Sequence, residues 1–265
     1  MTTSLSEPPE IVRSWAERVT GLVAAAAGEL TGAYLHGSAV LGGWQPDRSD
    51  VDLLFVTGGS LPLARLSNAT EVLFQSTADC PGTGLECSVV SADAARGTEP
   101  PWPYLLHVNA GPQQARMVLG DGSPGDPDLL MHYAVCRVAG WPLHGPPPAK
   151  VFGRIPRPQI LGYLVQELTW GLAHAPERYS VLNASRALLY AQDGLICSKV
   201  EGGTAALDRG LGPPDLLLRA LDQQSGLLPE QPRPAADAVA FVESAIAALR
   251  AAVAAAETGT EAGED

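Results

Sequence analysis

The chain has 265 residues, of which 46% are hydrophobic and 17% are charged. This composition is typical of a globular protein with a buried core and argues against a disordered chain. Lys and Arg total 17 against 29 Asp and Glu, so the formal net charge is −12. Because a nucleic-acid binder needs a basic face for the phosphates, we expect no nucleic-acid partner. The acidic balance favours a cationic partner or a metal held by carboxylates.

The cysteines and the apolar segments bear on cellular location. The four cysteines are scattered and include no C-x-x-C pair, so a zinc site of the usual spacing is not expected. Nothing near residue 1 resembles a signal peptide, and no uninterrupted apolar run approaches the roughly 18 residues of a transmembrane helix. We therefore expect a cytoplasmic protein without a membrane partner. A monomer is also expected.

The first half of the chain mixes helical and strand patterns. Apolar residues recur at helical spacing after Pro8 and Pro9, and short apolar runs bounded by glycine follow. This mixture predicts an α/β or α+β domain with a mixed sheet over residues 1–150. The expected elements are helices over 9–29, 61–75 and 127–143, and strands over 32–36, 51–56 and 85–90.

Proline and glycine crowd the stretch 145–158, where we place a domain boundary. No strand pattern follows it, so residues 158–256 are predicted to form an all-α helical bundle. The tail 257–265 carries four carboxylates and no base, and is predicted to be disordered. The expected helices of the second domain span 158–174, 180–192, 202–208, 213–223 and 235–256.

Two carboxylates stand close together at the second strand. Asp50 and Asp52 precede an apolar run, and side chains two apart on a strand point to the same face. Such a pair is costly unless a positive group lies between the carboxylates, and Mg²⁺ is the natural candidate. The alternative is an ordinary surface turn or strand end, where an isolated D-x-D is common.

A glycine-serine turn is separated from Asp50 by eleven residues. At Gly37 and Ser38 a strand turns into the next segment, where exposed backbone N–H groups could hold phosphate oxygens and glycine permits a close approach. Together with metal-binding carboxylates, such a turn favours phosphoryl or nucleotidyl transfer.

These motifs resemble a known family. The run His36-Gly37-Ser38-Ala39-Val40-Leu41-Gly42-Gly43-Trp44 through Ser49-Asp50-Val51-Asp52-Leu53-Leu54 is similar to the signature of nucleotidyltransferases of the DNA polymerase β type. Within that superfamily it resembles the aminoglycoside 3''-adenylyltransferases, which confer resistance to streptomycin and spectinomycin. The segment from Val181 through Arg186 and Ser198-Lys199 to Gly202-Gly203 resembles the helical domain of the same family.

The resemblance implies a role for each matching residue in the first domain. Asp50 and Asp52 would bind the Mg²⁺ that bridges the triphosphate of ATP. Ser38, the Gly37 backbone and Ser49 would hold phosphate oxygens. Glu86, in the third strand, would be the catalytic base that takes the proton from the acceptor hydroxyl. The alternative for Glu86 is a strand-edge carboxylate that faces water.

In the second domain the resemblance points to ATP and substrate contacts. Arg186 and Lys199 match basic residues that reach the ATP phosphates, so ATP would lie between the domains. Trp170 and Glu177 are the candidate substrate contacts. Without the resemblance, Arg186 would be interpreted as a residue in a salt bridge on a helix surface, and Lys199 as a solvated charge in a loop. His132 and His144 are expected to have structural or surface roles rather than metal ligation.

Several positions depart from the family pattern. The loop before Asp50 is one residue longer, and Gly111 aligns with a tryptophan that packs against the drug. Glu177 is the only acid in the stretch 170–179, where streptomycin enzymes carry acidic drug contacts. Adenylyl transfer is therefore better supported than the identity of the acceptor.

The expected activity is transfer of AMP from ATP to a hydroxyl of an aminoglycoside-type antibiotic, which would give resistance. Two alternatives remain. The acceptor could be another small molecule or a protein hydroxyl, or the chain could be a non-catalytic nucleotide-binding relative.

Overall fold

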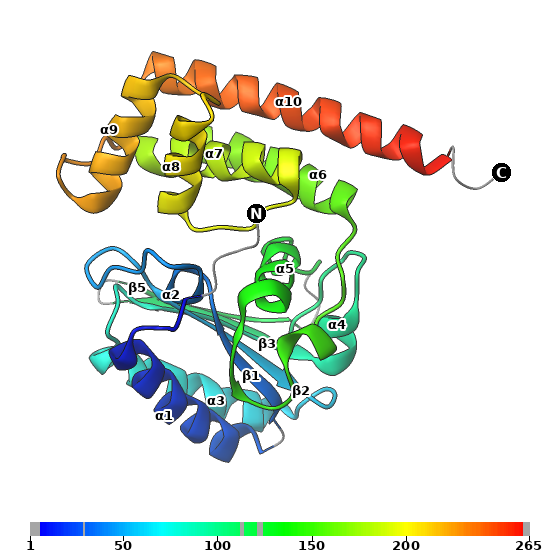
Figure 1. Cartoon of the computed structure of the whole chain (residues 1–265). Coiled ribbons are helices and arrows are strands. Elements are labelled where there is room, and N and C mark those ends of the chain that lie inside the picture. Colours follow the sequence, from blue (N-terminus) through cyan, green and yellow to red (C-terminus); the bar gives the residue numbers. More distant parts are fainter. Residues whose placement is uncertain (1–5, 29, 112–113, 121–123, 262–265) are drawn as a thin grey trace. The chain divides into compact units, whose positions relative to one another are not determined.

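A computed structural model describes residues 6–28, 30–111, 114–120 and 124–261 (Figure 1). The chain divides between Ile155 and Pro156 into an N-terminal and a C-terminal unit, and each is described by itself. The division falls in the segment rich in proline and glycine. The expected fold class, a mixed-sheet domain followed by an all-α domain, is confirmed.

The N-terminal unit is built on one six-stranded sheet with the order β5-β4-β3-β2-β1-β6. Strands β2 and β3 are parallel, and every other neighbouring pair is antiparallel. A parallel pair needs a crossover connection, which helix α3 provides here. The strands are β1 (Leu30–His36), β2 (Val51–Thr57), β3 (Leu85–Ser91), β4 (Leu106–Gly111), β5 (Gln114–Leu119) and β6 (Trp141–His144).

Helices cover both faces of this sheet (Figure 1). Helices α1 and α3 pack against each other on one face, where the Trp15 indole N–H donates to the Ser76 carbonyl at 3.3 Å. Helix α5 packs against β1 on the other face. The helices of this unit are α1 (Glu10–Ala27), α2 (Ser38–Leu41), α3 (Leu63–Ser76), α4 (Ala92–Arg96) and α5 (Asp128–Ala139), with short 3-10 turns at Thr77–Asp79 and Pro148–Lys150.

Two parts of this unit differ from the sequence-based prediction. The helix expected over 127–143 ends at Ala139, because Gly140 leaves the helical conformation and the next residues form β6. That strand alternates half-buried and exposed residues at the edge of the sheet, and carries Pro142, which edge strands tolerate. Strands β4 and β5 were not predicted, although β4 alternates apolar and polar residues as a half-buried strand does; β5 carries the polar residues Gln114 and Arg116.

The C-terminal unit is entirely helical in its described residues. Helix α7 is the central element and packs against its four neighbours. Glycines let α8 approach α7 closely, since a Cβ at Gly202 would lie 2.5 Å from Cγ of Arg186 and one at Gly203 would lie 2.6 Å from Cδ2 of Leu182. The helices are α6 (Arg157–His174), α7 (Glu177–Asp193), α8 (Lys199–Asp208), α9 (Pro214–Ser225) and α10 (Ala236–Glu261).

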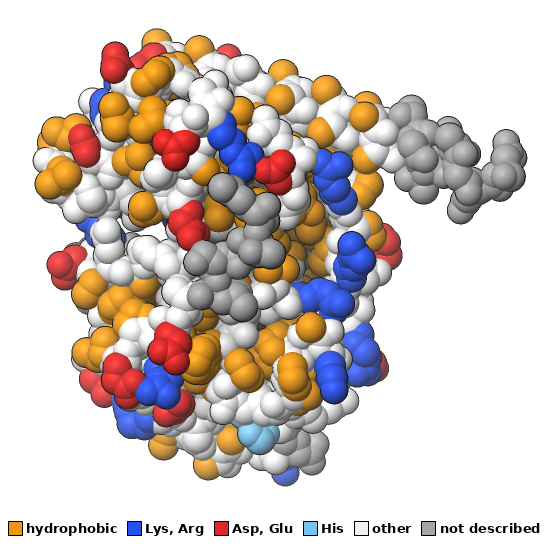
Figure 2. Space-filling model, in the orientation of Figure 1, with side chains coloured by type: hydrophobic (Ala, Val, Ile, Leu, Met, Phe, Trp, Pro, Cys, Tyr) orange, Lys and Arg blue, Asp and Glu red, His pale blue; other side chains and the backbone are white. Residues whose placement is uncertain are grey.

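Helix α10 is longer than the sequence predicted. It continues to Glu261, past Ala256 where the disordered tail was expected to begin, and residues 262–265 lie outside the described part. Its segment Ala236–Ala256 is the one described helix that is long and apolar enough to cross a membrane. Apolar side chains are visible along it in Figure 2. Because α10 also packs against α6 and α7, as a core helix does, this is weak evidence for a membrane span.

Candidate active site

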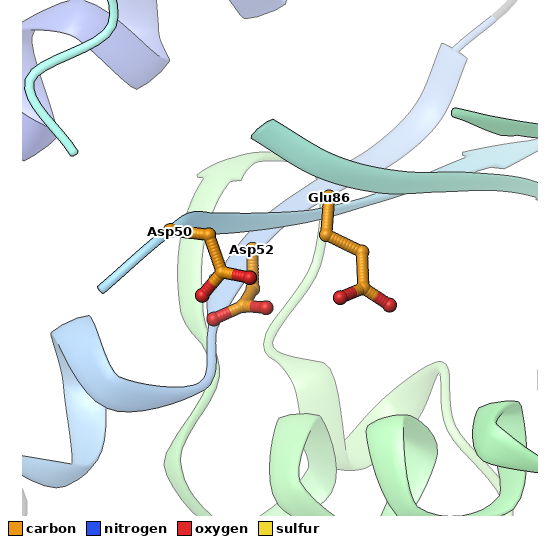
Figure 3. Close-up of side chains that lie close together, drawn as sticks. All are labelled: Asp50, Asp52 and Glu86. Atoms are coloured by element: carbon orange, nitrogen blue, oxygen red, sulfur yellow. The ribbon is translucent and has the colours of Figure 1, made fainter. Parts of the chain in front are cut away.

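Three carboxylates meet where strands β2 and β3 begin. Asp52 and Glu86 are directly opposed neighbours in the parallel pair, and Asp50 lies just before β2. Each side chain offers one oxygen, and the three oxygens lie within 4.8 Å of one another. Figure 3 shows all three carboxylates pointing to the same side of the sheet. The sequence therefore predicted the residues of this cluster, and the parallel pairing brings them together.

Backbone hydrogen bonds fix the segment that carries Asp50. The Thr83 N–H donates to the Ser49 carbonyl at 2.8 Å, and the Val51 N–H donates to the Gly84 carbonyl at 2.9 Å. The Trp44 indole N–H donates to the Asp50 carbonyl at 3.2 Å. These contacts join the loops that precede β2 and β3, so the positions of the carboxylates depend on one another.

Gly37 lies against the carboxylates. Its φ is +65°, and a Cβ there would lie 1.9 Å from Oδ2 of Asp52. No other residue fits without moving that carboxylate, which explains the glycine at this position. The turn therefore brings backbone directly to the side of Asp52.

The two serines predicted to hold phosphate differ in their surroundings. The Ser38 hydroxyl is buried and has no hydrogen-bond partner among the described residues. A buried hydroxyl without a partner is unusual, and a ligand oxygen would satisfy it. The Ser49 hydroxyl instead accepts a hydrogen bond from the Gln45 N–H at 3.1 Å, which stabilises the loop before Asp50. Ser38 is thus the better placed of the two to bind a ligand.

Burial and neighbouring charges act on Glu86. Burial raises the pKa of its carboxyl above the ordinary value of 4.5. A charge on His132 lowers that pKa, and the charge on Asp50 raises it. His132 on α5 brings Nε2 to 3.9 Å from Oε1 of Glu86. A carboxyl with a raised pKa is better suited to accept a proton than an ordinary one.

His36 and His132 form a contact that the sequence did not predict. Their ring centroids lie 4.9 Å apart, and His36 is buried with its pKa held well below its ordinary range by burial and by His132. His36 is also the strand neighbour of Asp52. His36 stands beside Gly37 in the motif, whereas His132 comes from a distant helix and carries no local signal.

The carboxylate cluster fits a divalent cation. Carboxylate oxygens are the preferred ligands of Mg²⁺, and three of them from separate side chains converge here. Their mutual repulsion, evident in the effect of Asp50 on the pKa of Glu86, would be relieved by a positive ion.

In the C-terminal unit, Arg186 and Lys199 lie where α7 and α8 pack. The Arg186 guanidinium donates to Oδ1 of Asn183 at 2.5 Å and to the Cys197 carbonyl at 3.4 Å. Lys199 is the first residue of α8, and its Nζ lies 4.7 Å from the centre of the Tyr179 ring. A capping box between Ser198 and Glu201 fixes the start of that helix.

The two predicted substrate contacts differ in accessibility. Trp170 is 51% exposed and stacks on His174, with ring centroids 5.3 Å apart. Glu177 is fully buried, and its carboxylate accepts hydrogen bonds from Nε of Arg219 at 2.8 Å and from the Ala235 N–H at 3.0 Å. A buried carboxylate with these partners stabilises the helical unit, and the geometry argues against its prediction as a substrate contact.

Comparisons with known proteins agree with this architecture. Residues 150–253 match the family model described as the aminoglycoside adenylyltransferase C-terminal domain. The structure is similar to that of the spectinomycin adenyltransferase AAD(9) from Enterococcus faecialis, determined with ATP and spectinomycin. The TM-score is 0.65 and the identity is 17%, over 89% of this chain and 98% of that one. No curated protein matches the chain significantly. The helical part of this chain therefore matches the aminoglycoside adenylyltransferase C-terminal domain, and the chain shares its fold with the spectinomycin adenyltransferase.

Proposed function

We propose that the protein transfers AMP from ATP to a hydroxyl of an aminoglycoside-type antibiotic, of the streptomycin or spectinomycin kind, and so gives resistance. The observation that carries this proposal is the carboxylate cluster of Asp50, Asp52 and Glu86 beside the Gly37-Ser38 turn. The domain family and the structural relative support the same activity.

Asp50 and Asp52 are proposed to hold Mg²⁺. When bound, the ion would neutralise the triphosphate and make the α-phosphorus more electrophilic. The Gly37 backbone and the Ser38 hydroxyl, which has no hydrogen-bond partner in the described part of the chain, would bind phosphate oxygens at the edge of this cluster. Ser49 would act mainly by holding the loop that carries Asp50. The contacts of Arg186 and Lys199 with the phosphates are proposed on the family resemblance.

Glu86 is proposed as the general base. It would accept the proton of the acceptor hydroxyl while the hydroxyl oxygen forms a bond to the α-phosphorus and the bond to the leaving pyrophosphate breaks. The raised pKa of Glu86 suits this role, because a more basic carboxylate accepts a proton more readily.

The net charge of −12 supports a cationic acceptor, which an acidic protein attracts. Trp170 remains the proposed acceptor contact in the helical unit, since its ring is accessible.

We also expect the protein to act as a cytoplasmic monomer, without nucleic-acid or membrane partners.

Growth of a sensitive bacterium tests the proposal. Cells expressing the wild-type chain should grow at higher concentrations of at least one drug in a panel of streptomycin, spectinomycin and related compounds. Cells expressing equal amounts of the Asp52→Asn variant should remain sensitive. Absence of protection against every drug in the panel, with soluble protein present, would contradict an antibiotic acceptor.

A further inference from the structure

One line of cross-strand neighbours crosses five strands of the sheet. Along it His36, Asp52, Glu86, Asn109 and Arg116 stand in register on β1 to β5. Directly opposed residues on neighbouring strands project from the same face of a sheet. Asn109 therefore lies beside Glu86, on the side away from Asp52.

The surroundings of Asn109 are suited to a ligand. Its side chain is half-buried, and its amide makes no hydrogen bond with another described residue. An Asn amide offers two donors and an acceptor oxygen, and directly opposed Cβ atoms lie about 5 Å apart. The amide is thus within the reach of a molecule that also touches the carboxylate of Glu86.

The order of residues in this line separates two sides of the site. Under the proposed function, on which this inference rests, Asp50 and Asp52 hold the metal and the nucleotide phosphates on the β2 side of Glu86. The acceptor hydroxyl has to reach Glu86 from elsewhere, and the β4 side carries Asn109.

We propose that Asn109 is an acceptor-binding residue. Its amide would hydrogen-bond to an oxygen neighbouring the hydroxyl that Glu86 deprotonates. The acceptor class that fits has two adjacent oxygens, as in a vicinal diol or a hydroxy ketone. Arg116 is the next residue in this line, on β5, and carries an exposed positive charge. We therefore expect the part of the acceptor that contacts Asn109 to be uncharged, even where the rest of the molecule is cationic.

Steady-state kinetics with ATP and spectinomycin as the probe acceptor tests this assignment. Asn109→Ala should raise the KM for the acceptor about tenfold, the loss expected for one good hydrogen bond, and leave the KM for ATP unchanged. Asn109→Asp keeps the shape of the side chain but loses both hydrogen-bond donors, and should raise the KM for the acceptor by a comparable factor. His144→Gln, an exposed change on the opposite edge strand, is the matched control and should behave as wild type.

A deoxy analogue of the acceptor, without the neighbouring oxygen, sharpens the test. Wild type and Asn109→Ala should use that analogue equally well, because the hydrogen bond is absent in both cases. An unchanged acceptor KM in Asn109→Ala, or an equal change in the KM for ATP, would overturn the inference while adenylyl transfer stands. A folded wild-type protein that modifies no acceptor would instead remove the proposed function, and this assignment with it.

Discussion

Asp52 and Glu86 are directly opposed on the parallel strands β2 and β3. A parallel pair forms only through a crossover, so the connection through α3 is what brings the two carboxylates together. The metal-binding and base functions that we propose thus depend on the topology of the sheet as much as on the residues.

Replacing Asp52 with Asn should abolish turnover without unfolding the protein. The change removes one negative oxygen from the cluster and preserves the shape of the side chain. Metal-ion catalysis is worth several kcal/mol, so we expect a loss of about a hundredfold or more in kcat. Product formation and thermal melting would be measured together, and undiminished activity would rule out the proposed metal role.

Replacing Glu86 with Gln should slow the chemical step far more than it weakens ATP binding. General base catalysis contributes about 10²–10⁴-fold, and Gln cannot accept the proton. Single-turnover rates and ATP affinity would be compared in the variant and wild type. If ATP affinity alone suffers, Glu86 is a third metal ligand and not the base.

The loss of activity at acidic pH should report the ionisation of Glu86. The base acts only when ionised, so activity is lost as the pH falls through its pKa. Burial raises that pKa above 4.5 and bound Mg²⁺ would lower it, so the His132→Gln variant and wild type are compared at the same Mg²⁺ concentration. A positive charge on His132 lowers the pKa, so His132→Gln should move this loss of activity to higher pH. If the loss of activity at acidic pH occurs at the same or a lower pH in His132→Gln than in wild type, the proposed effect of His132 on the pKa of Glu86 is contradicted.

Gly37→Ala should inactivate the protein through a local clash. The new Cβ would meet Oδ2 of Asp52, and the backbone conformation adds a strain of about 1–3 kcal/mol. Gly194 is the matched control, because its φ is +68° but nothing lies within 4 Å of its Cβ position. Gly194→Ala should cost about 1 kcal/mol of stability and leave activity intact. Equal activity of the two variants would show that the close approach of Gly37 to Asp52 is unimportant.

Glu177→Ala should destabilise the protein rather than alter its substrate range. The change leaves Arg219 and the Ala235 N–H without their buried acceptor, at a cost of about 2 kcal/mol or more. Asp237 is the other partner of Arg219, and its side chain is 52% exposed. Asp237→Asn removes only the charge of this partner and should cost less than about 1 kcal/mol. Urea unfolding of both variants checks the difference. An increased KM for the acceptor with unchanged stability would restore Glu177 as a substrate contact.

Much of the fold could be predicted because its signals are local. The apolar runs before Gly37 and after Asp52 are short and bounded by turns, and only helical patterns follow the proline-rich segment. Strands β4 and β5 lie at one edge of the sheet, and the prediction overlooked the apolar and polar alternation of β4, which is typical of a half-buried strand.

The site was predictable where its residues lie close in sequence. Asp50 and Asp52 share one strand face, and the turn at Gly37 precedes them in the same motif. The neighbours of Glu86 could not be found in this way. His132 arrives from α5 and Asn109 from β4, so their positions follow only from tertiary packing and strand register. Similarly, no local feature of Glu177 revealed that its partners come from α9 and the segment before α10.

The most direct measurement is mass spectrometry of the products formed from ATP, Mg²⁺ and a panel that includes streptomycin and spectinomycin. We expect one drug to gain a single AMP unit with release of pyrophosphate, and that product to be lost with Asp50→Asn, Asp52→Asn or Glu86→Gln. An adduct that forms equally well with the variants, or ATP bound by wild type with no AMP transferred to any drug, would contradict the proposal that this carboxylate cluster adenylylates an antibiotic.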